Sequence, residues 1–226
     1  MGEPVIDMAA PEAYQLWSAS YDDTLNPLLA LEMRVVRDRL DLRPGCVLID
    51  AASGTGRWGL HARAEGAEAI AFDVSPGMLA IAAARDSLAG RLAIADMRAI
   101  PVADAAADLA ICSFALSYVP SVEETIAELA RVARSFVVSD LHPLAIAAGW
   151  SRSFRCGAQV YRIQSYAHSL PSIEKAARDA GMEKRWELEA RFGTPEEHIF
   201  RAAGKEERFR RAREIPAIYA QCWGHR

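Results

Sequence analysis

Acidic residues close three successive apolar runs of the chain. Asp50 ends the run over residues 46–50, Asp73 ends 69–73 and Asp96 ends 92–96. A carboxylate can accept hydrogen bonds from both hydroxyls of a vicinal diol, and it can also offset the charge of a cationic ligand. One such aspartate is more often a helix cap or a solvated loop residue. Three in succession, together with the glycines described next, favour a binding site for a small polar molecule.

A glycine-rich stretch, Ser53-Gly54-Thr55-Gly56, follows the first of these aspartates. Glycine is needed where the backbone must turn sharply and approach a ligand closely. With Gly59 the stretch also satisfies the GxGxxG motif of dinucleotide-binding enzymes, so a nicotinamide or flavin enzyme must be considered. However, the Asp50 carboxylate would repel a pyrophosphate. Asp73 also comes too soon, because the dinucleotide motif expects its acid about 20 residues beyond the glycines.

The segment from Asp50 to Gly56, followed by Asp73 and Asp96, resembles the class I S-adenosylmethionine-dependent methyltransferases over roughly residues 12–140. The resemblance implies S-adenosyl-L-methionine as cofactor and S-adenosyl-L-homocysteine as product. It places Asp50 near the amino acid part of the cofactor, Asp73 at the ribose hydroxyls and Asp96 at the adenine amino group. The other cofactor contacts that it implies are Ala52, Ser53, Gly54, Gly56, Val74, Met78, Met97, Ser113 and Phe114.

One position departs from the family pattern, which usually has glycine where this chain has Ala52. If the backbone there needed a positive φ, alanine would be disfavoured. The sequence therefore predicts a slightly shifted loop or weaker cofactor binding.

Aromatic residues near the N-terminus resemble the helix that covers the cofactor in this family. Tyr14 and Tyr21 are expected to donate hydrogen bonds to the cofactor's carboxylate, and Tyr21 is also a candidate for the chemistry. Trp17 either lines the acceptor pocket or packs as an ordinary core residue. Tyr118 follows the predicted fourth strand, where acceptor contacts are common in the family.

Two histidines are candidates for a general base. His142 is the first, because histidine titrates near neutrality and the end of the fifth predicted strand faces the site. His168 and Tyr166 belong to a segment expected to roof the acceptor pocket. Each histidine could equally be structural, since only geometry can establish such a role. Arg152 and Arg155 could recognise an anionic acceptor, although solvated surface arginines are the favoured interpretation.

These residues require a framework in which strands alternate with helices. Apolar runs at 46–50, 69–73, 92–96, 107–114 and 135–140 alternate with helical patterns at 57–65, 76–86 and 121–133. Such alternation predicts right-handed crossovers and a doubly wound sheet. Further predictions are a helical stretch over 11–41 broken at Asn26-Pro27, an extended segment at 158–167, a helix at 171–180, a strand at 183–191, a charged helical insert at 196–213 and a last strand at 217–223.

The predicted fold class is therefore α/β, with a doubly wound, seven-stranded, mostly parallel Rossmann-like sheet, helices on both faces and an N-terminal helical cap. Residues 1–226 are predicted to form a single domain. Residues 1–41 would be the cap, 42–140 the cofactor-binding core, and 141–226 the acceptor-side insertions and last strands.

Composition narrows the class of acceptor and the compartment. The chain has 226 residues, 51% of them hydrophobic, and a net charge of −4, which suits a globular enzyme better than a nucleic-acid binder. Ser113-Phe114-Ala115-Leu116 stands where enzymes that methylate base amines carry an Asn/Asp-Pro-Pro-aromatic motif. Four isolated cysteines predict no metal site and a reducing compartment. Without a signal peptide or a membrane-length apolar stretch, a cytoplasmic protein is expected.

The sequence thus predicts methyl transfer to an oxygen, nitrogen or carbon atom of a small-molecule acceptor, with neither a membrane nor a nucleic acid as partner. Three alternatives stay open. An RNA or protein methyltransferase could dock through the basic residues within 201–213. An NAD-dependent oxidoreductase and a non-catalytic cofactor-binding protein are the other two.

Overall fold

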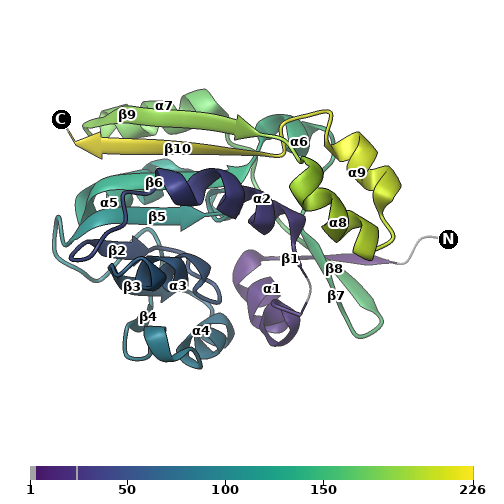
Figure 1. Cartoon of the computed structure of the whole chain (residues 1–226), viewed down its shortest axis with the longest axis horizontal. Coiled ribbons are helices and arrows are strands. Elements are labelled where there is room, and N and C mark those ends of the chain that lie inside the picture. Colours follow the sequence, from purple (N-terminus) through teal and green to yellow (C-terminus); the bar gives the residue numbers. More distant parts are fainter. Residues whose placement is uncertain (1–3, 24, 226) are drawn as a thin grey trace.

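A seven-stranded sheet forms the centre of the computed structural model, which describes residues 4–23 and 25–225 (Figure 1). The strand order is β4-β3-β2-β5-β6-β10-β9. The bounds are β2 Val47–Asp50, β3 Glu68–Asp73, β4 Leu92–Ile94, β5 Ala107–Ser113, β6 Ala133–Leu141, β9 Met182–Ala190 and β10 Ile218–His225. The two pairings of β10, with β6 and with β9, are antiparallel, whereas the other pairings among these strands are parallel. The predicted mostly parallel sheet is confirmed.

Helices cover both faces of this sheet. On one face, α5 (Glu123–Val132) and α7 (Leu170–Asp179) pack against residues that include Ile49 and Phe136. On the other face, α2 (Pro27–Val36), α3 (Arg57–Ala64) and α4 (Pro76–Ala83) pack against residues that include Leu48 and Val137. Neighbouring residues of one strand enter opposite cores because side chains alternate along a strand. The strands of the sheet centre are therefore buried on both sides, as their continuous apolar sequence predicts.

Local sequence signals set the start of several of these helices. Asn26 caps α2 by accepting a hydrogen bond from the Leu28 amide at 3.0 Å, and Pro27 is the first helical residue. Ser75 caps α4 in the same way, followed again by a proline. A polar cap and then a proline at the first helical position is a favourable helix start. The predicted break at Asn26-Pro27 is confirmed.

The N-terminal region forms the predicted helical cap, with one short strand before its helices. It begins with β1 (Val5–Met8), continues through α1 (Ala10–Trp17) and a 3₁₀ turn (Ser18–Ser20), and after α2 ends in a second 3₁₀ turn (Arg37–Arg39). β1 pairs in parallel with β8 (Gln159–Ile163), which also pairs with β7 (Ser153–Cys156). A short strand whose partner lies so far along the chain leaves no local sequence signal. β8 lies within the predicted extended segment 158–167.

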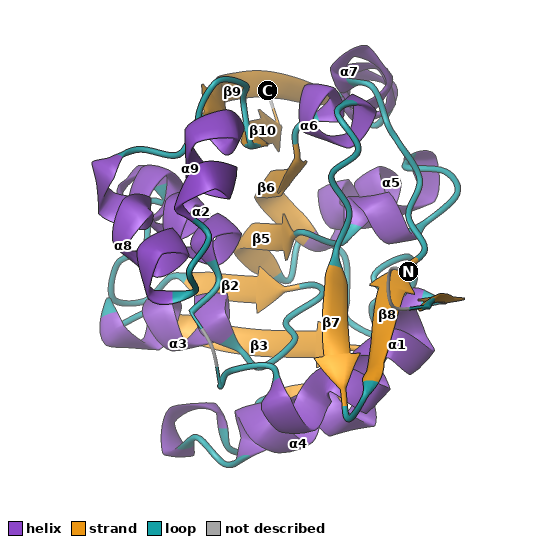
Figure 2. Ribbon diagram, turned by 90° about the vertical axis from the view of Figure 1, so that its right-hand side faces the viewer, coloured by secondary structure: helices purple, strands orange, loops and turns teal. Residues whose placement is uncertain are grey.

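The small three-stranded sheet and α1 lie together at one end of the molecule (Figure 2). Their shared core contains Ala13, Phe154 and Ile163. Three further short elements are α6 (Pro143–Ala147) and the 3₁₀ turns Asp86–Leu88 and Leu116–Tyr118. This end of the molecule is where the carboxyl ends of the central strands open.

The charged insert forms two helices, α8 (Thr194–Ala202) and α9 (Glu206–Ala212). Phe200 and Phe209 are buried on their inner side. On the outer side, Arg201 pairs with Glu197, and Arg210 and Arg211 pair with Glu207. The three arginines are thus matched by acids on their own helices. Over the described ranges, none of the helices has the length and apolar character needed to cross a lipid bilayer.

Candidate active site

A cavity of about 480 Å³ lies at the carboxyl ends of β2, β3 and β5. Its walls come from the glycine-rich loop, from the start of α3 and from residues of the cap that include Tyr14 and Tyr21. This is the place where an open α/β sheet binds its ligands, and the volume suits a small molecule. The predicted contacts that line it are Tyr14, Tyr21, Asp50, Ala52, Ser53, Gly54, Asp73, Val74, Met78, Asp96, Met97, Ser113, Phe114 and Tyr118.

The backbone of the glycine-rich loop explains which of its residues must be glycine. Gly54 and Gly56 have φ values of +54° and +86°. A Cβ on Gly56 would also lie 2.5 Å from Cδ1 of Leu88. Ala52 is not among the residues with positive φ; Ala105 and Phe114 are the only non-glycine examples in the described part of the chain. The predicted conflict at Ala52 was therefore wrong, because alanine fits that backbone without strain.

Asp73 holds the loop in place while lining the cavity. Its Oδ2 accepts a hydrogen bond from the Gly54 amide at 2.7 Å, and Oδ1 accepts one from the Ser75 amide at 2.8 Å. Burial raises the pKa of Asp73, although these amides counteract the rise. Each carboxylate oxygen can accept more than one hydrogen bond, so Asp73 can still receive ligand hydroxyls.

Asp96 lies at the more open side of the cavity. Its carboxylate accepts hydrogen bonds from the backbone and side chain of Arg98, at 2.9 Å from the amide and 2.7 Å from Nη2. The Arg98 side chain lowers the pKa of Asp96. Asp96 is therefore an ionised acceptor, held in a fixed orientation beside Met97.

Besides Nε1 of Trp58 and Nη2 of Arg152, three buried polar atoms of the cavity wall have no hydrogen-bond partner among the described residues. They are Oδ1 of Asp50, Oγ of Ser53 and Nη1 of Arg57. The other Asp50 oxygen accepts the Gly59 amide at 3.2 Å, and burial raises the pKa of Asp50 to about 7. Buried polar groups are normally satisfied, so unpaired ones lining a cavity indicate an absent partner. An acceptor and a cationic donor side by side match a ligand that carries both an ammonium and a carboxylate group.

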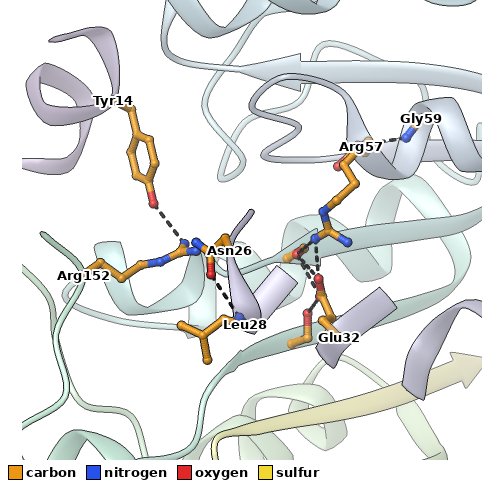
Figure 3. A network of polar contacts seen from close by, with 10 residues as sticks. Tyr14, Asn26, Leu28, Glu32, Arg57, Gly59 and Arg152 are labelled. Atoms are coloured by element: carbon orange, nitrogen blue, oxygen red, sulfur yellow. Dashed lines mark hydrogen bonds and ion pairs between the residues drawn. The ribbon is translucent and has the colours of Figure 1, made fainter. Parts of the chain in front are cut away.

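Arg57 is held by a buried glutamate that the sequence analysis did not select. Glu32 of α2 is fully buried and forms an ion pair with Nη2 of Arg57 (Figure 3). It also accepts hydrogen bonds from Ser113 Oγ at 2.8 Å and from Ser139 Oγ. A sequence signal existed: Glu32 lies four residues after Leu28 and four before Val36, on the apolar side of the helix. An acid in that position is expected to have a buried partner.

The cap is joined to the cavity rim by polar contacts. Asp22 accepts hydrogen bonds from Thr55 Oγ1 at 3.1 Å and from Arg85 Nη2 at 2.6 Å. Gln15 of α1 accepts the Gly77 amide at the start of α4, at 2.8 Å. These bonds hold the α1 region over the glycine-rich loop, which places the cap tyrosines in the cavity wall.

Arg152 also lines the cavity, and its expected solvated position was wrong. Its guanidinium is buried, donates to Tyr14 Oη at 3.0 Å and stands over the ring of Phe114 at 4.7 Å (Figure 3). The Tyr14 hydroxyl lies 2.8 Å from that of Tyr118. The aromatic cap residues and Arg152 therefore form one connected group.

Four predicted acceptor-site residues are not brought to the cavity. His142 caps α6 through Nδ1, and its Nε2 lies 3.3 Å from Glu189 Oε2. The imidazole ring points toward the backbone of α6 because this helix begins immediately after His142. His168 Nε2 lies 2.9 Å from the carbonyl oxygen of Val119. No imidazole is therefore placed to act as a base in the described cavity lining.

The other two are aromatic. Tyr166 is 49% exposed, and its amide donates to the Ser117 carbonyl at 2.7 Å. Trp17 stacks on Phe154 with ring centroids 4.8 Å apart, which is the ordinary packing alternative. Tyr21 is the one candidate for the chemistry that does line the cavity.

The fold and the sequence around this cavity match known proteins. The structure aligns with an S-adenosylmethionine dependent methyltransferase from Mesorhizobium loti with a TM-score of 0.67 and 19% identity, covering 88% of this chain and 100% of that one. Residues 48–136, which contain the glycine-rich loop and all three aspartates, match the sequence model of the methyltransferase domain. Residues 48–136 therefore carry the sequence pattern of a methyltransferase domain, and the fold is similar to that of solved S-adenosylmethionine-dependent methyltransferases.

Curated proteins that are similar in sequence to this chain are named for different acceptors. The chain is 32% identical over 136 residues to a malonyl-[acyl-carrier protein] O-methyltransferase from Serratia marcescens, covering 58% of this chain and 51% of the relative. It is 35% identical over 119 residues to a demethylmenaquinone methyltransferase from Mycolicibacterium vanbaalenii, covering 50% of each. The chain thus spans about half the length of these relatives.

Proposed function

We propose that this protein transfers a methyl group from S-adenosyl-L-methionine to an oxygen, nitrogen or carbon atom of a small-molecule acceptor. The observation that carries the proposal is the set of unpartnered buried atoms on Asp50, Ser53 and Arg57, which face the same cavity as Asp73. An amino acid group, a ribose and a base joined in one ligand would satisfy this arrangement.

Each polar group of the cofactor can be assigned to a different residue of the cavity wall. Asp50 would accept from the ammonium group and Arg57 would donate to the carboxylate, because these are the unpaired atoms of matching polarity. Asp73 would receive the ribose hydroxyls, and Asp96 the adenine amino group with Met97 beside the ring. Tyr21 is the remaining cap donor toward the carboxylate, since the Tyr14 hydroxyl is already engaged by Tyr118 and Arg152.

S-adenosylmethionine supplies an electrophilic methyl group when it is bound. The protein's own contribution is to fix the geometry of donor and acceptor and to exclude water, which accounts for a large part of such accelerations. The absence of an imidazole from the described lining suits an acceptor that needs no strong base.

A small-molecule acceptor is supported by the size of the cavity and by the ion pairs that Arg201 and Arg211 make with acids on their own helices. The match of residues 48–136 to the methyltransferase domain argues against the nicotinamide-dependent oxidoreductase. The cysteines Cys46, Cys112, Cys156 and Cys222 are free thiols, which supports a location in the reducing cytoplasm.

Calorimetry with S-adenosylhomocysteine tests the proposal. We expect the wild type to bind it and not to bind NADH. Asp73→Ala should weaken binding by about 2 kcal/mol, because hydrogen bonds to a charged group are worth about 1.5–3 kcal/mol. Asp179→Ala, at an exposed acid of α7, is the matched control and should bind like the wild type.

Two results would count against the proposal. A wild type that binds NADH but not S-adenosylhomocysteine would overturn the function itself. Suppose that the Asp73→Ala variant has the same free energy of unfolding as the wild type and binds S-adenosylhomocysteine with wild-type affinity. Asp73 would then not belong to the ribose site. Radiolabelled methyl transfer to candidate acceptors would then separate an enzyme from a protein that only binds the cofactor.

A further inference from the structure

Arg152 is a buried cation that lines the cavity without an ion-pair partner among the described residues. Its side chain belongs to a residue only 8% exposed, on the segment between α6 and β7. Nη1 donates to the Tyr14 hydroxyl, whereas Nη2 has no hydrogen-bond partner. A buried charge is costly unless it is paired, so this guanidinium needs an explanation.

The groups around Arg152 do not neutralise it. Burial raises the pKa of Tyr14 and of Tyr118, so both are neutral phenols at physiological pH. Asp140 lies nearby, but its two oxygens accept the amides of Ser117 at 2.8 Å and Leu141 at 2.7 Å, and burial raises its pKa. The positive charge is therefore left without a carboxylate in contact.

The cavity wall beneath Arg152 is held in an unusual conformation. Phe114 has a φ of +53°, which is rare for a bulky residue, and its amide donates to the Ser139 carbonyl at 2.7 Å. Such backbone strain persists where the surrounding structure fixes it, and it concentrates at binding sites. Here it sets the Phe114 ring against the guanidinium, which fixes the plane of the Arg152 fork.

We propose that Arg152 binds a carboxylate of the methyl acceptor. The planar fork of an arginine matches the two oxygens of a carboxylate. The adjoining lining is apolar and includes Pro11, Tyr118 and Val119, so the carboxylate belongs to a molecule with an apolar body. This inference rests on the proposed function and names the class of substrate that it acts on.

The cofactor's own carboxylate is assigned to the other arginine. Arg57 lies at the glycine-rich loop with Glu32 and Asp50, whereas Arg152 lies at the cap with Tyr14 (Figure 3). The two cations stand at different parts of one cavity, and each retains one unpartnered nitrogen. Arg57 would bind the carboxylate of the cofactor and Arg152 the carboxylate of the acceptor, which explains why the cavity has two arginines.

Ligand-observed NMR on the protein saturated with S-adenosylhomocysteine tests this inference, with benzoate, benzamide and inorganic phosphate as probes. We expect benzoate to bind at least about tenfold more tightly than benzamide, which has the same shape without the charge. Arg152→Gln should weaken benzoate binding at least about tenfold and change the affinity for S-adenosylhomocysteine by less than about twofold. Arg152→Lys should recover part of the loss. Arg178→Gln, at an exposed arginine of α7, should bind benzoate like the wild type.

Each other result would overturn the inference in a distinct way. Equal binding of benzoate and benzamide by the wild type would remove the charge requirement, and this comparison holds even if Arg152→Gln fails to fold. A large loss of S-adenosylhomocysteine affinity in Arg152→Gln would assign Arg152 to the cofactor. Preference for phosphate over benzoate would reject the carboxylate. If the wild type does not bind S-adenosylhomocysteine at all, the proposed function itself fails.

Discussion

Asp50 shows at the scale of one residue how burial and ligand charge oppose each other. Burial raises its pKa to about 7, and one of its oxygens has no partner. In the free protein Asp50 is thus largely protonated below neutrality, which avoids the cost of a buried anion. By linkage, this carboxyl stabilises the fold at low pH, and its contribution is lost as the pH rises from its ordinary value through about 7.

We expect the affinity for S-adenosylhomocysteine to fall as the pH is lowered through 7. The ligand's ammonium group requires the ionised carboxylate, so binding at lower pH must release a proton from Asp50. The dissociation constant should rise about tenfold between pH 8 and pH 6. Calorimetry over this range, in buffers of different ionisation enthalpy, measures both the affinity and the released proton.

Asp50→Asn provides the control, because it keeps the shape and removes the titration. It should bind more weakly at pH 8 and show a flat affinity profile. A wild-type profile that is equally flat would mean that Asp50 does not face the ligand's ammonium group.

The cavity-lining aspartates at the strand ends could be predicted from sequence, whereas the burial of Arg152 and the actual role of His142 could not. Asp50, Asp73 and Asp96 each follow an apolar run, and parallel strands bring their carboxyl ends to one edge. Arg152 has no such marker, since its neighbours in sequence are those of an ordinary surface loop. Its burial depends on β7, β8 and the cap packing together, which no local pattern encodes. His142 failed for the opposite reason: a plausible residue at a strand end was used to cap the next helix.

At the scale of elements, α2 is tied to the sheet by Glu32. This carboxylate contacts Arg57 at the start of α3, Ser113 at the end of β5 and Ser139 within β6. One side chain thereby joins four elements at the edge of the cavity. Buried pairs of this kind contribute little net stability as a unit, but removing one partner leaves the other charge uncompensated.

We expect Glu32→Ala to lower the free energy of unfolding by about 3 kcal/mol. This lies at the lower end of the range of about 3–5 kcal/mol for breaking a buried pair, because the Arg57 side chain is still 25% exposed to solvent. Affinity for S-adenosylhomocysteine should fall as well, since Arg57 loses the contact that orients it. Urea denaturation and calorimetry measure the two effects.

Glu207→Ala is the matched control, since this acid also pairs with an arginine but is 65% exposed on α9. It should cost less than about 1 kcal/mol and leave ligand binding unchanged. Equal losses of stability in the two variants would show that the Glu32 pair is no more important than a surface pair.

The strands and helices of the central sheet could be predicted from sequence. Each strand has its own apolar run, and each helix has its own periodic pattern and local start signal. The strands of the small sheet could not be predicted in this way. β1 and β7 are only four residues long each, and they are stable only because β8 lies between them. Isolated short strands have no stability of their own, so their sequences need no strong pattern.

At the scale of the whole molecule, the last strand in the sequence lies inside the sheet. β10 pairs with β6 on one side and β9 on the other, and residues 218–224 are all buried. Trp223 is fully buried in the core formed with α5 and α7. Because β10 is the only described strand that bridges β6 and β9, the sheet cannot be completed before β10 is available.

We expect Trp223→Ala to lower the free energy of unfolding by about 3–5 kcal/mol, since it opens a cavity in a close-packed core and removes a large buried surface. Urea denaturation followed by circular dichroism measures the loss. Tyr166→Ala, at a side chain that is 49% exposed, should stay within about 0.5 kcal/mol of the wild type. If both substitutions cost the same, the Trp223 side chain would not contribute to the stability of the core formed with α5 and α7.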